Sequence, residues 1–412
     1  MAELRSVAVG CALALLPLLT ACSKAPTRDE SIRATGPFAM GSDSDADGAD
    51  ADAPAPAAER DAGPTGDHVV TEPREYVFVA SGTWGPAEPG HLTSYALDRE
   101  TGSLTPIDRK QVGGLASFVA RHPALPILYV ADEELGGVHA VHVEPATGKL
   151  TPGEHRGSSG KPVYLSVDAA GTVLLAANYG EGTTVVFPLD RAGAVGEAAH
   201  TYATGAKSHA APIRPGTSHV YVPSLDRNAI AQFRLADGAL VPLTPADVPQ
   251  TGGPRHVAFH PEGHRAYVVS ELGDVVGIYA VSAAGTLSAR GTARRLPAEH
   301  ASAPATHTGA DVHVTPSGRH AYVTNRGQSN TLARYAVTAD GDLTLLGHES
   351  TRGETPRNFT IEPAGELLLV GNQDSKNVAI FRIDEASGAL THLETTDVGV
   401  SPFFVALWRF EP

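Results

Sequence analysis

Residues 253–271 have the sequence GPRHVAFHPEGHRAYVVSE, which is the pattern of a β-hairpin. Two short apolar runs flank a turn rich in proline and glycine, as in antiparallel strand pairs. Arg255 stands near the start of the first strand, and Glu271 directly follows the second. Because the outer ends of an antiparallel hairpin lie side by side, the sequence predicts that these opposite charges are neighbours.

The same hairpin recurs along the chain. Apolar strands that close on a small or polar residue end at Ser81, Asp132, Asn178, Ser224, Ser270, Asn325 and Asn372. These positions lie 46 to 55 residues apart, and most copies continue into a third strand and a Gly-x-Leu turn before a fourth. Four strands in each repeat of this length are typical of propeller blades. The sequence therefore predicts an all-β, seven-bladed β-propeller.

The first copy lacks a leading strand, because Pro73 and Arg74 enter directly on the second. Residues 401–407, SPFFVAL, have the pattern of that missing strand. We expect this C-terminal strand to complete the first blade and close the ring, which removes exposed sheet edges. A solenoid with open ends is the alternative arrangement of the same repeats.

Residues 1–22 are predicted to be a lipoprotein signal peptide. The apolar run 7–19 is too short to span a bilayer of roughly 30 Å as a helix, and it leads into Leu-Thr-Ala-Cys. That tetrapeptide resembles the bacterial lipoprotein box, which implies lipid attachment at Cys22 and cleavage before it. An ordinary secretory signal with an incidental cysteine is the alternative. Lipidation would anchor the chain in the cell envelope, at the outer membrane or periplasmic face if the cell is Gram-negative.

Residues 23–73 are rich in Ala, Asp, Pro, Gly and Ser and poor in large apolar residues, so a disordered acidic linker is predicted. The propeller then occupies residues 74–412, and we expect a monomer. The formal net charge of −15 gives the surface no general attraction for nucleic acid or anionic lipid. An anionic ligand would therefore require a local cluster of arginines.

The repeat predicts which residues face the mouth of the central channel. One position per blade begins the innermost strand, and it holds Ser117, Val163, His209, Arg255, Ala310 and Arg357. The other position directly follows the second strand, and it holds Gly82, Glu133, Tyr179, Leu225, Glu271, Arg326 and Gln373. Both positions lie on one face of the ring. The sequence therefore predicts a pocket that contains His209, Arg255, Glu271, Arg326 and Arg357.

Three arginines near the axis suggest recognition of an anion. A guanidinium group binds carboxylate or phosphate through two parallel hydrogen bonds, and burying several together is unfavourable without anionic partners. A structural Arg–Glu network that braces neighbouring blades is the alternative. Strand alternation places His256 on the opposite side from Arg255. His260 precedes a hairpin turn, where we expect its ring to bond backbone groups.

These stretches resemble the bacterial lactonase family of seven-bladed propellers, typified by 6-phosphogluconolactonase and related to carboxy-cis,cis-muconate cyclase. The resemblance covers roughly residues 74–410. It is densest in the segments Gly252–Pro261, Tyr267–Leu272, Asp311–Arg319 and Tyr322–Arg326. It implies that the active-site pattern of the family falls on His209, Arg255, Glu271 and Arg326, and it implies no metal and no organic cofactor.

The resemblance suggests an envelope hydrolase that opens a lactone with an anionic substituent. Glu271 would activate water, with His209 as the alternative base or as the acid for the leaving alkoxide. Arg255 or Arg326 would stabilise the oxyanion, and Arg357 would hold the anionic substituent. Burial would raise the pKa of Glu271 and the arginines would lower it, so the sequence leaves its direction open. The alternatives are a non-catalytic binding or scaffold propeller and a muconate-type cycloisomerase.

Overall fold

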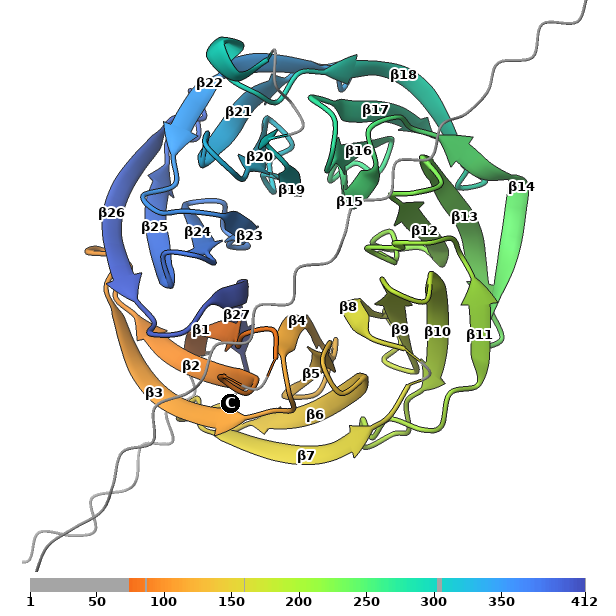
Figure 1. The fold of residues 1–412 in the computed structure, drawn as a ribbon, viewed down its shortest axis with the longest axis vertical. Helices are drawn as coiled ribbons and strands as arrows, with labels where there is room; N and C mark the ends of the chain where they lie inside the picture. Colours follow the sequence, from red (N-terminus) through yellow and green to blue (C-terminus); the bar gives the residue numbers. More distant parts are fainter. Residues whose placement is uncertain (1–73, 86, 159, 302–305, 412) are drawn as a thin grey trace, which may run out of the picture. The chain divides into compact units, whose positions relative to one another are not determined.

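The computed structural model describes residues 74–411, apart from residues 86, 159 and 302–305. Cys22, the predicted signal peptide and the predicted linker lie outside these described residues, so those three assignments stay predictions. Seven β-sheets form a ring around a central channel (Figure 1). The predicted seven-bladed propeller is confirmed.

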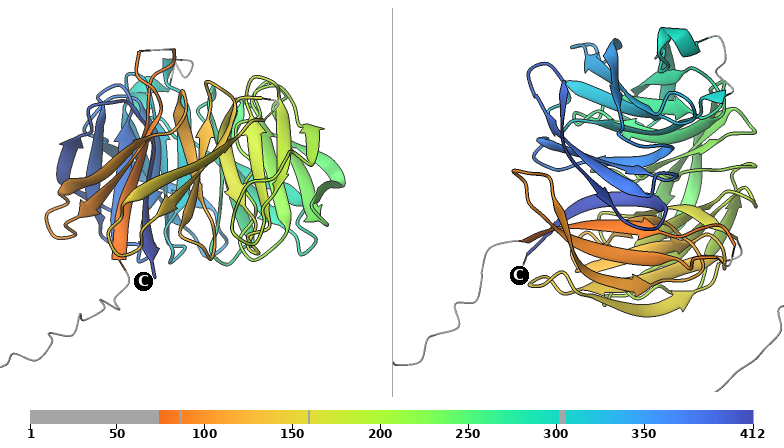
Figure 2. Two further views of the ribbon diagram at one scale, coloured as in Figure 1. Left: turned by 90° about the horizontal axis from the view of Figure 1, so that it is seen from below. Right: turned by 60° about the vertical axis from the view of Figure 1, so that its left-hand side comes forward.

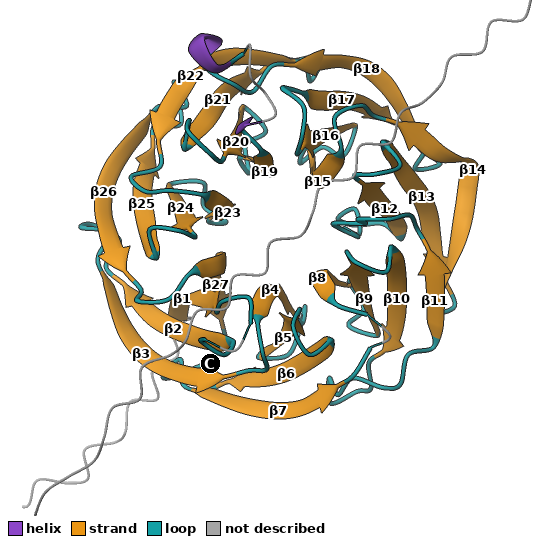
Figure 3. Cartoon of the chain, in the orientation of Figure 1, coloured by secondary structure: helices purple, strands orange, loops and turns teal. Residues whose placement is uncertain are grey.

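Strands make up nearly all of the regular structure (Figure 3). Helical structure in the described part of the chain is confined to 3-10 segments, which are the turn η1 (Ala298–His300) and Thr306. None of the described residues form a helix long and apolar enough to cross a membrane.

Each blade is a meander of antiparallel strands that runs from the channel to the outer rim of the ring. The first blade contains β27 (Pro402–Phe410), β1 (Arg74–Ser81), β2 (His91–Leu97) and β3 (Leu104–Gln111). The second contains β4 (Ala116–Arg121), β5 (Ile127–Asp132), β6 (Gly137–Val143) and β7 (Leu150–Arg156). The third contains β8 (Pro162–Val167), β9 (Val173–Asn178), β10 (Thr183–Pro188) and β11 (His200–Ala203). The fourth contains β12 (His219–Ser224), β13 (Ala229–Ala236) and β14 (Ala239–Pro249).

The last three blades have four strands each. The fifth contains β15 (Pro254–Phe259), β16 (Arg265–Ser270), β17 (Val276–Val281) and β18 (Leu287–Ala293). The sixth contains β19 (Gly309–Val314), β20 (His320–Asn325), β21 (Thr331–Val337) and β22 (Leu343–Ser350). The seventh contains β23 (Pro356–Ile361), β24 (Leu367–Asn372), β25 (Asn377–Ile383) and β26 (Leu390–Asp397).

The C-terminal strand closes the ring as predicted. β27 pairs antiparallel with β1, with Leu407 opposite Val77 and Val405 opposite Val79. All four side chains are buried. The seventh and first blades therefore pack together, and the first blade gains its innermost strand from the far end of the chain.

The apolar core is divided into seven clusters, one at each interface between neighbouring blades. Successive residues of β1 show the principle. Val77 and Val79 pack toward the seventh blade, whereas Tyr76 and Phe78 pack toward the second. Both faces of an inner strand are buried, so these strands are continuous apolar runs rather than alternating ones.

The fourth blade departs from the four-strand pattern at its inner edge. Residues 208–213 contact β12 through two isolated bridges and not through a regular ladder. Pro212 in this segment and Pro223 in β12 lack a backbone N–H, which interrupts the hydrogen bonding. His209 nevertheless stays at the inner edge, because its backbone N–H donates to the carbonyl oxygen of Pro223 at 3.1 Å.

The strands cross the thickness of the ring, so their ends lie on its two faces (Figure 2). The second strands of the blades end at the predicted residues, which are Ser81, Asp132, Asn178, Ser224, Ser270, Asn325 and Asn372. Because these strands run in the same direction, the residues that follow them gather on one face. That face carries the candidate active site.

Candidate active site

A cavity of about 260 Å³ lies where the second strands end. All seven blades contribute to its wall, because both predicted positions of the repeat converge there. The lining residues are Trp84, Glu133, Val163, Tyr179, His209, Glu271, Arg326 and Arg357. Four of the five predicted pocket residues thus line one cavity. The fifth, Arg255, lies beneath it and not in its wall, with 2% of its side chain exposed.

β-Bulges at the start of the innermost strands direct arginine side chains into the channel. The pairing of β15 with β16 shifts between Pro254 and His256, which leaves Arg255 as the extra residue. β23 has the same shift at Arg357. The extra residue of a β-bulge changes the direction of the neighbouring side chains, so successive side chains no longer point to opposite faces of the strand there. The expectation that His256 points away from Arg255 is wrong for this reason, since both side chains line the channel.

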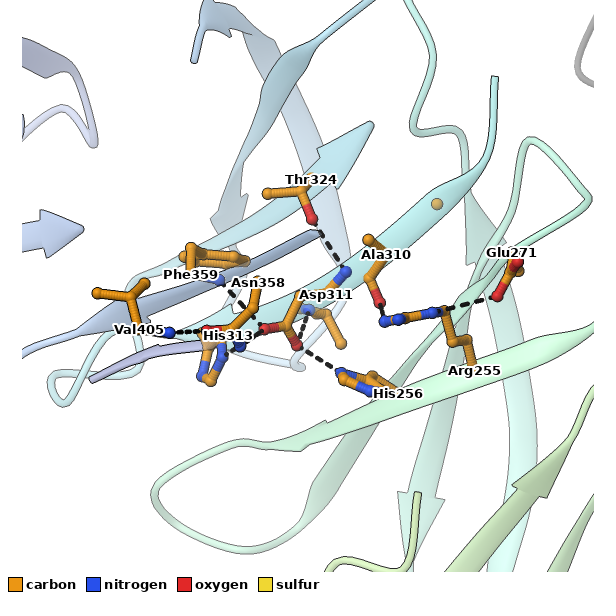
Figure 4. Close-up of polar contacts among 12 residues, drawn as sticks. Arg255, His256, Glu271, Ala310, Asp311, His313, Thr324, Asn358, Phe359 and Val405 are labelled. Atoms are coloured by element: carbon orange, nitrogen blue, oxygen red, sulfur yellow. Dashed lines mark hydrogen bonds and ion pairs between the residues drawn. The ribbon is translucent and has the colours of Figure 1, made fainter. Parts of the chain in front are cut away.

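The carboxylate of Glu271 lies between two guanidinium groups. Its Oε2 is 3.1 Å from Nε of Arg255, and its Oε1 is 3.2 Å from Nη2 of Arg326. The backbone of β19 holds both arginines, because Arg255 Nη1 donates to Ala310 O and Arg326 Nη2 donates to Gly309 O at 3.0 Å. The predicted proximity of Arg255 and Glu271 is confirmed (Figure 4).

The arginines decide the charge state of Glu271. Burial raises the pKa of this carboxyl group, but the charges of Arg326, Arg255 and Arg357 outweigh burial and hold the pKa below its ordinary 4.5. Burial also lowers the pKa of Arg255 to about 9, which leaves it protonated at neutral pH. The question that the sequence left open is therefore resolved in favour of an ionised Glu271.

Arg357 is held by aromatic rings. Its guanidinium lies 4.8 Å from the ring centre of Phe403 and 5.4 Å from that of Trp84, within cation–π range. Trp84 is held in turn by Glu133, whose Oε1 accepts a hydrogen bond from the indole N–H at 3.3 Å. Within the described residues, the Arg357 guanidinium makes no hydrogen bond or ion pair, so its donors are available to a ligand in the cavity.

The charges around the cavity do not cancel. Arg255, Arg326 and Arg357 contribute three positive charges, and Glu133 and Glu271 contribute two negative charges. The formal sum, 3 − 2, is +1. Because these groups are desolvated, such an excess attracts an anion more strongly than it would at an exposed surface.

His209 is neutral at physiological pH. Burial lowers its pKa well below 6.5, and the charges of Arg255, His256 and Arg357 lower it further. Its ring packs edge-on against Tyr179 and His256, with ring centres 5.4 Å and 5.2 Å away. A neutral imidazole can accept a proton or donate an N–H hydrogen bond. The sequence-based alternative, in which a protonated His209 donates a proton to the leaving alkoxide, requires an imidazolium group. The low pKa of His209 disfavours that charged form.

Asp311 is the centre of a network of polar contacts next to Arg255 and Glu271 (Figure 4). Its carboxylate accepts hydrogen bonds from His256 Nδ1 at 2.8 Å, from Asn358 Nδ2 at 2.6 Å and from His313 Nε2 at 3.2 Å, as well as from two backbone N–H groups. Asn358 Oδ1 accepts in turn from the backbone of Val405 at 2.8 Å. One carboxylate thereby links blades five, six, seven and one.

The charge state of this network follows from its burial. Burial would raise the pKa of Asp311, but His313 and His256 together with their hydrogen bonds hold it well below its ordinary value. Burial lowers the pKa of His256 to about 4, with the charge of Arg255 adding to the effect. An ionised Asp311 therefore accepts from a neutral His256 at neutral pH. The network fixes β23 at Asn358, which directly follows Arg357 in the sequence.

The channel continues below the candidate active site. A second cavity of about 220 Å³ is lined by the Asp311 network and by the aromatic residues Phe118, Tyr164, Phe404 and Trp408. His256 and Asn358 line both this cavity and a small space of about 10 Å³ whose wall also includes His209 and Arg357 of the candidate active site.

Sequence reasoning gave no role to Trp84, Glu133, Tyr179 or Asp311. Glu133 and Tyr179 occupy positions that were predicted to face the mouth of the channel, but they were not part of the arginine-rich group that suggested a site. Trp84 lies in the loop after β1, outside both repeat positions, although the rarity of tryptophan in this chain was an available signal. Asp311 is an ionisable residue within an apolar strand, and such a residue signals a buried polar network.

A family model described as "Lactonase, 7-bladed beta-propeller" matches residues 77–407. The chain belongs to this lactonase family. The chain is 32% identical to a 6-phosphogluconolactonase of Yersinia pestis over 338 residues, which cover 81% of this chain and 98% of the relative. It is 31% identical to a 6-phosphogluconolactonase of Sodalis glossinidius, with 81% and 99% covered. The predicted assignment to the carboxylic-ester hydrolases is thereby supported.

Solved structures agree with this assignment to the lactonase family. The periplasmic gluconolactonase PpgL of Pseudomonas aeruginosa superimposes with a TM-score of 0.75 at 25% identity, covering 82% of this chain and 100% of that chain. A putative 6-phosphogluconolactonase of Bacteroides fragilis has a TM-score of 0.74 at 25% identity, with 83% and 100% covered.

Replacing Asp311 tests whether its network holds the site together. Asp311→Ala leaves the donors of His256, His313 and Asn358 without their acceptor, and loss of one partner from a buried ionic network typically costs about 3–5 kcal/mol. We expect the free energy of unfolding, measured by chemical denaturation, to fall by that amount. Asp226→Ala removes an exposed ion pair with Lys207 and should cost about 0–1 kcal/mol. Equal effects of the two changes would contradict the role of Asp311.

Proposed function

We propose that this member of the lactonase family hydrolyses a sugar δ-lactone that carries an anionic substituent, and that it does so at the cell envelope. The observation that carries the proposal is the arrangement of one ionised carboxylate, Glu271, and two cavity-facing guanidinium groups around a cavity of about 260 Å³. The arrangement provides a proton acceptor, a site for a developing oxyanion and an unpaired cation in one place.

Glu271 would accept a proton from water as the water attacks the lactone carbonyl. A new C–O bond forms, and negative charge develops on the former carbonyl oxygen. Arg326 would stabilise this oxyanion, since its side chain lines the cavity beside Glu271. One such donor is typically worth about 3–4 kcal/mol of transition-state stabilisation.

Collapse of the tetrahedral intermediate would break the ring C–O bond. The departing alkoxide takes up the proton that Glu271 has just accepted, which yields an open hydroxy acid and restores the carboxylate. This assignment requires no imidazolium, in keeping with the low pKa of His209. His209 would then orient substrate or water through its neutral ring.

Arg255 would act through Glu271 and not on the substrate. Its side chain is 2% exposed, and it contacts the carboxylate and a backbone carbonyl of β19. It is therefore a positioning residue, which holds the carboxylate in place and lowers its pKa. This differs from the sequence-based hypothesis that Arg255 stabilises the oxyanion.

Two observations support the substrate class and location. Relatives that match nearly over their full length are named 6-phosphogluconolactonase, and the unpaired guanidinium of Arg357 suits a phosphate or carboxylate substituent. A structural neighbour is a periplasmic gluconolactonase, which supports a location in the envelope, whereas the signal sequence and the lipidation at Cys22 rest on the sequence alone.

A panel of two lactones tests the role of Arg357. We expect wild-type protein to favour 6-phosphoglucono-δ-lactone over uncharged glucono-δ-lactone. Arg357→Gln should lower kcat/KM on the phosphorylated lactone by about 10- to 100-fold, because a hydrogen bond to a charged group is worth roughly 1.5–3 kcal/mol. Turnover of the uncharged lactone should change much less.

The exposed Arg319, which pairs with Glu385, provides the matched control, and Arg319→Gln should leave both rates unchanged. Equal losses on both lactones in Arg357→Gln would rule out recognition of an anionic substituent. Hydrolysis of neither lactone by wild-type protein would favour the non-catalytic binding propeller.

The pH dependence tests Glu271 as the proton acceptor. In wild-type protein kcat/KM should be level from about pH 6 to 8, because His209 does not titrate there, and should fall in acid as Glu271 becomes protonated. Burial raises the pKa of Glu271 and Arg326 opposes it, so Arg326→Gln should move this acidic limb to higher pH. A limb that stays in place in Arg326→Gln, or a wild-type limb centred near pH 6.5, would contradict the assignment.

A further inference from the structure

A second group of ionisable residues lies at the end of the second blade, outside the lining of the candidate active site. It consists of Asp132 at the end of β5, His139 on β6 and His155 on β7. One ligand atom from each residue lies within 4.8 Å of the others. The three strands are neighbours in one sheet, and His139 is directly opposite His155 in the register.

Asp132 and His139 form a long hydrogen bond whose length also matches the separation of two ligands on one metal ion. Asp132 Oδ2 and His139 Nε2 are 3.4 Å apart, which is longer than the usual 2.7–3.2 Å for an N–H···O hydrogen bond. Two ligands bound at 2.0–2.1 Å to a tetrahedral Zn²⁺ ion are about 3.3 Å apart. The carboxylate is aimed by the backbone, because its oxygens accept from the N–H groups of Gly114, Leu115 and Leu135.

Two glycines make room for the group. A Cβ atom at Gly113 would lie 2.0 Å from Asp132 Oδ2 and 2.8 Å from His139 Nε2, and one at Gly137 would lie 2.5 Å from His155 Nε2. Their positive φ angles of 82° and 135° independently favour glycine. A side chain at either position would separate the three candidate ligands.

The other blades serve as an internal comparison. In blades three, six and seven an asparagine replaces Asp132, and its amide donates to a side chain at the start of the next strand, as in Asn178 to Thr183 at 3.0 Å and Asn325 to Thr331 at 3.1 Å. In blade two the residue at that next position is Gly137, which has no side chain. The two imidazoles occupy the space, so this strand end is built differently.

We propose that Asp132, His139 and His155 bind a divalent transition-metal ion of the Zn²⁺ class. Asp132 Oδ2, His139 Nε2 and one nitrogen of His155 supply three ligands, and water supplies the fourth. Two imidazoles and a carboxylate are ligands typical of zinc and poorly suited to calcium or magnesium. The rings of His139 and His155 lie side by side, with ring centres 4.4 Å apart, so both imidazoles face the same space beside Asp132.

The structure also offers a contrasting group of the same residue types. His260, Glu262 and His264 lie equally close together. Both ring nitrogens of His260 are already engaged, since Nδ1 accepts from Glu262 N at 3.2 Å and Nε2 lies 3.2 Å from Gly318 O. This agrees with the turn-bonding role that the sequence predicted for His260, and it makes His264 a matched control.

The test is a competition titration of Zn²⁺ between the full chain, with both cysteines alkylated, and a chromophoric chelator. We expect wild-type protein to bind one Zn²⁺ ion per chain tightly. His139→Gln and His155→Gln should each weaken that binding at least about tenfold, since changes to groups that merely orient ligands already cost 10- to 100-fold. His264→Gln should bind as wild type does. With Co²⁺ in place of Zn²⁺, the visible bands of tetrahedral cobalt should appear in wild type and be lost in both blade-two variants.

His155→Gln changes an exposed side chain, so far-UV circular dichroism should show the variant folded like wild type. The proposal is overturned if wild-type protein binds no tight Zn²⁺, or if His139→Gln and His155→Gln retain wild-type affinity. It is also overturned if His264→Gln removes the tight binding of that ion, or if Ca²⁺ or Mg²⁺ displaces Zn²⁺ at equal concentration. Lactone turnover is not part of the readout, so the outcome is independent of the proposed hydrolase function.

Discussion

The antiparallel pairing of β27 with β1 is the constraint on which the channel depends. It places the seventh blade beside the first, although the two ends of the propeller domain are more than 300 residues apart in the sequence. One wall of the candidate active site exists only through this pairing, because Phe403 belongs to β27 and Trp84 follows β1. These two rings hold Arg357, which extends from β23 of the seventh blade. The hydrogen bond from Val405 to Asn358 joins the same blades lower in the channel.

The candidate active site inside this closed ring brings together buried charges that an apolar core would not contain. Desolvating three arginines is costly unless each finds a partner. Arg255 and Arg326 share Glu271 and the carbonyl oxygens of β19, whereas Arg357 has aromatic faces alone among the described residues. A group left incompletely paired in an otherwise satisfied structure marks a position where a ligand completes the interactions. The neutral state of His209 and the ionised state of Glu271 follow from the same charges.

The repeat made most of the architecture predictable from sequence. Each second strand ends at the expected residue, because an apolar run buried on both faces must stop where the chain reaches the surface of the ring. The convergence of His209, Glu271, Arg326 and Arg357 followed from their positions within the repeat alone. Local geometry was not predictable in the same way. The bulge that directs both Arg255 and His256 into the channel depends on a one-residue register shift, and alternation cannot anticipate such a shift.

Sequence reasoning also gave no role to residues that lie outside the two repeat positions used to predict the pocket. Asp311 gains its importance from partners on two other blades, and these contacts exist only in the folded ring. The group formed by Asp132, His139 and His155 has no familiar zinc spacing, because cross-strand register and not helical or loop spacing brings the residues together. The irregular inner edge of the fourth blade follows from two prolines whose effect depends on which strand they face.

The most direct test of the central claim, that Glu271 performs chemistry and does not merely brace two arginines, is the kcat/KM of Glu271→Gln on 6-phosphoglucono-δ-lactone. Loss of a positioned proton acceptor should lower kcat/KM by about 10²- to 10⁴-fold. Glu197→Gln, which removes an exposed carboxylate on the outer surface, should hydrolyse the lactone as wild type does. Wild-type turnover by a folded Glu271→Gln protein would contradict the account.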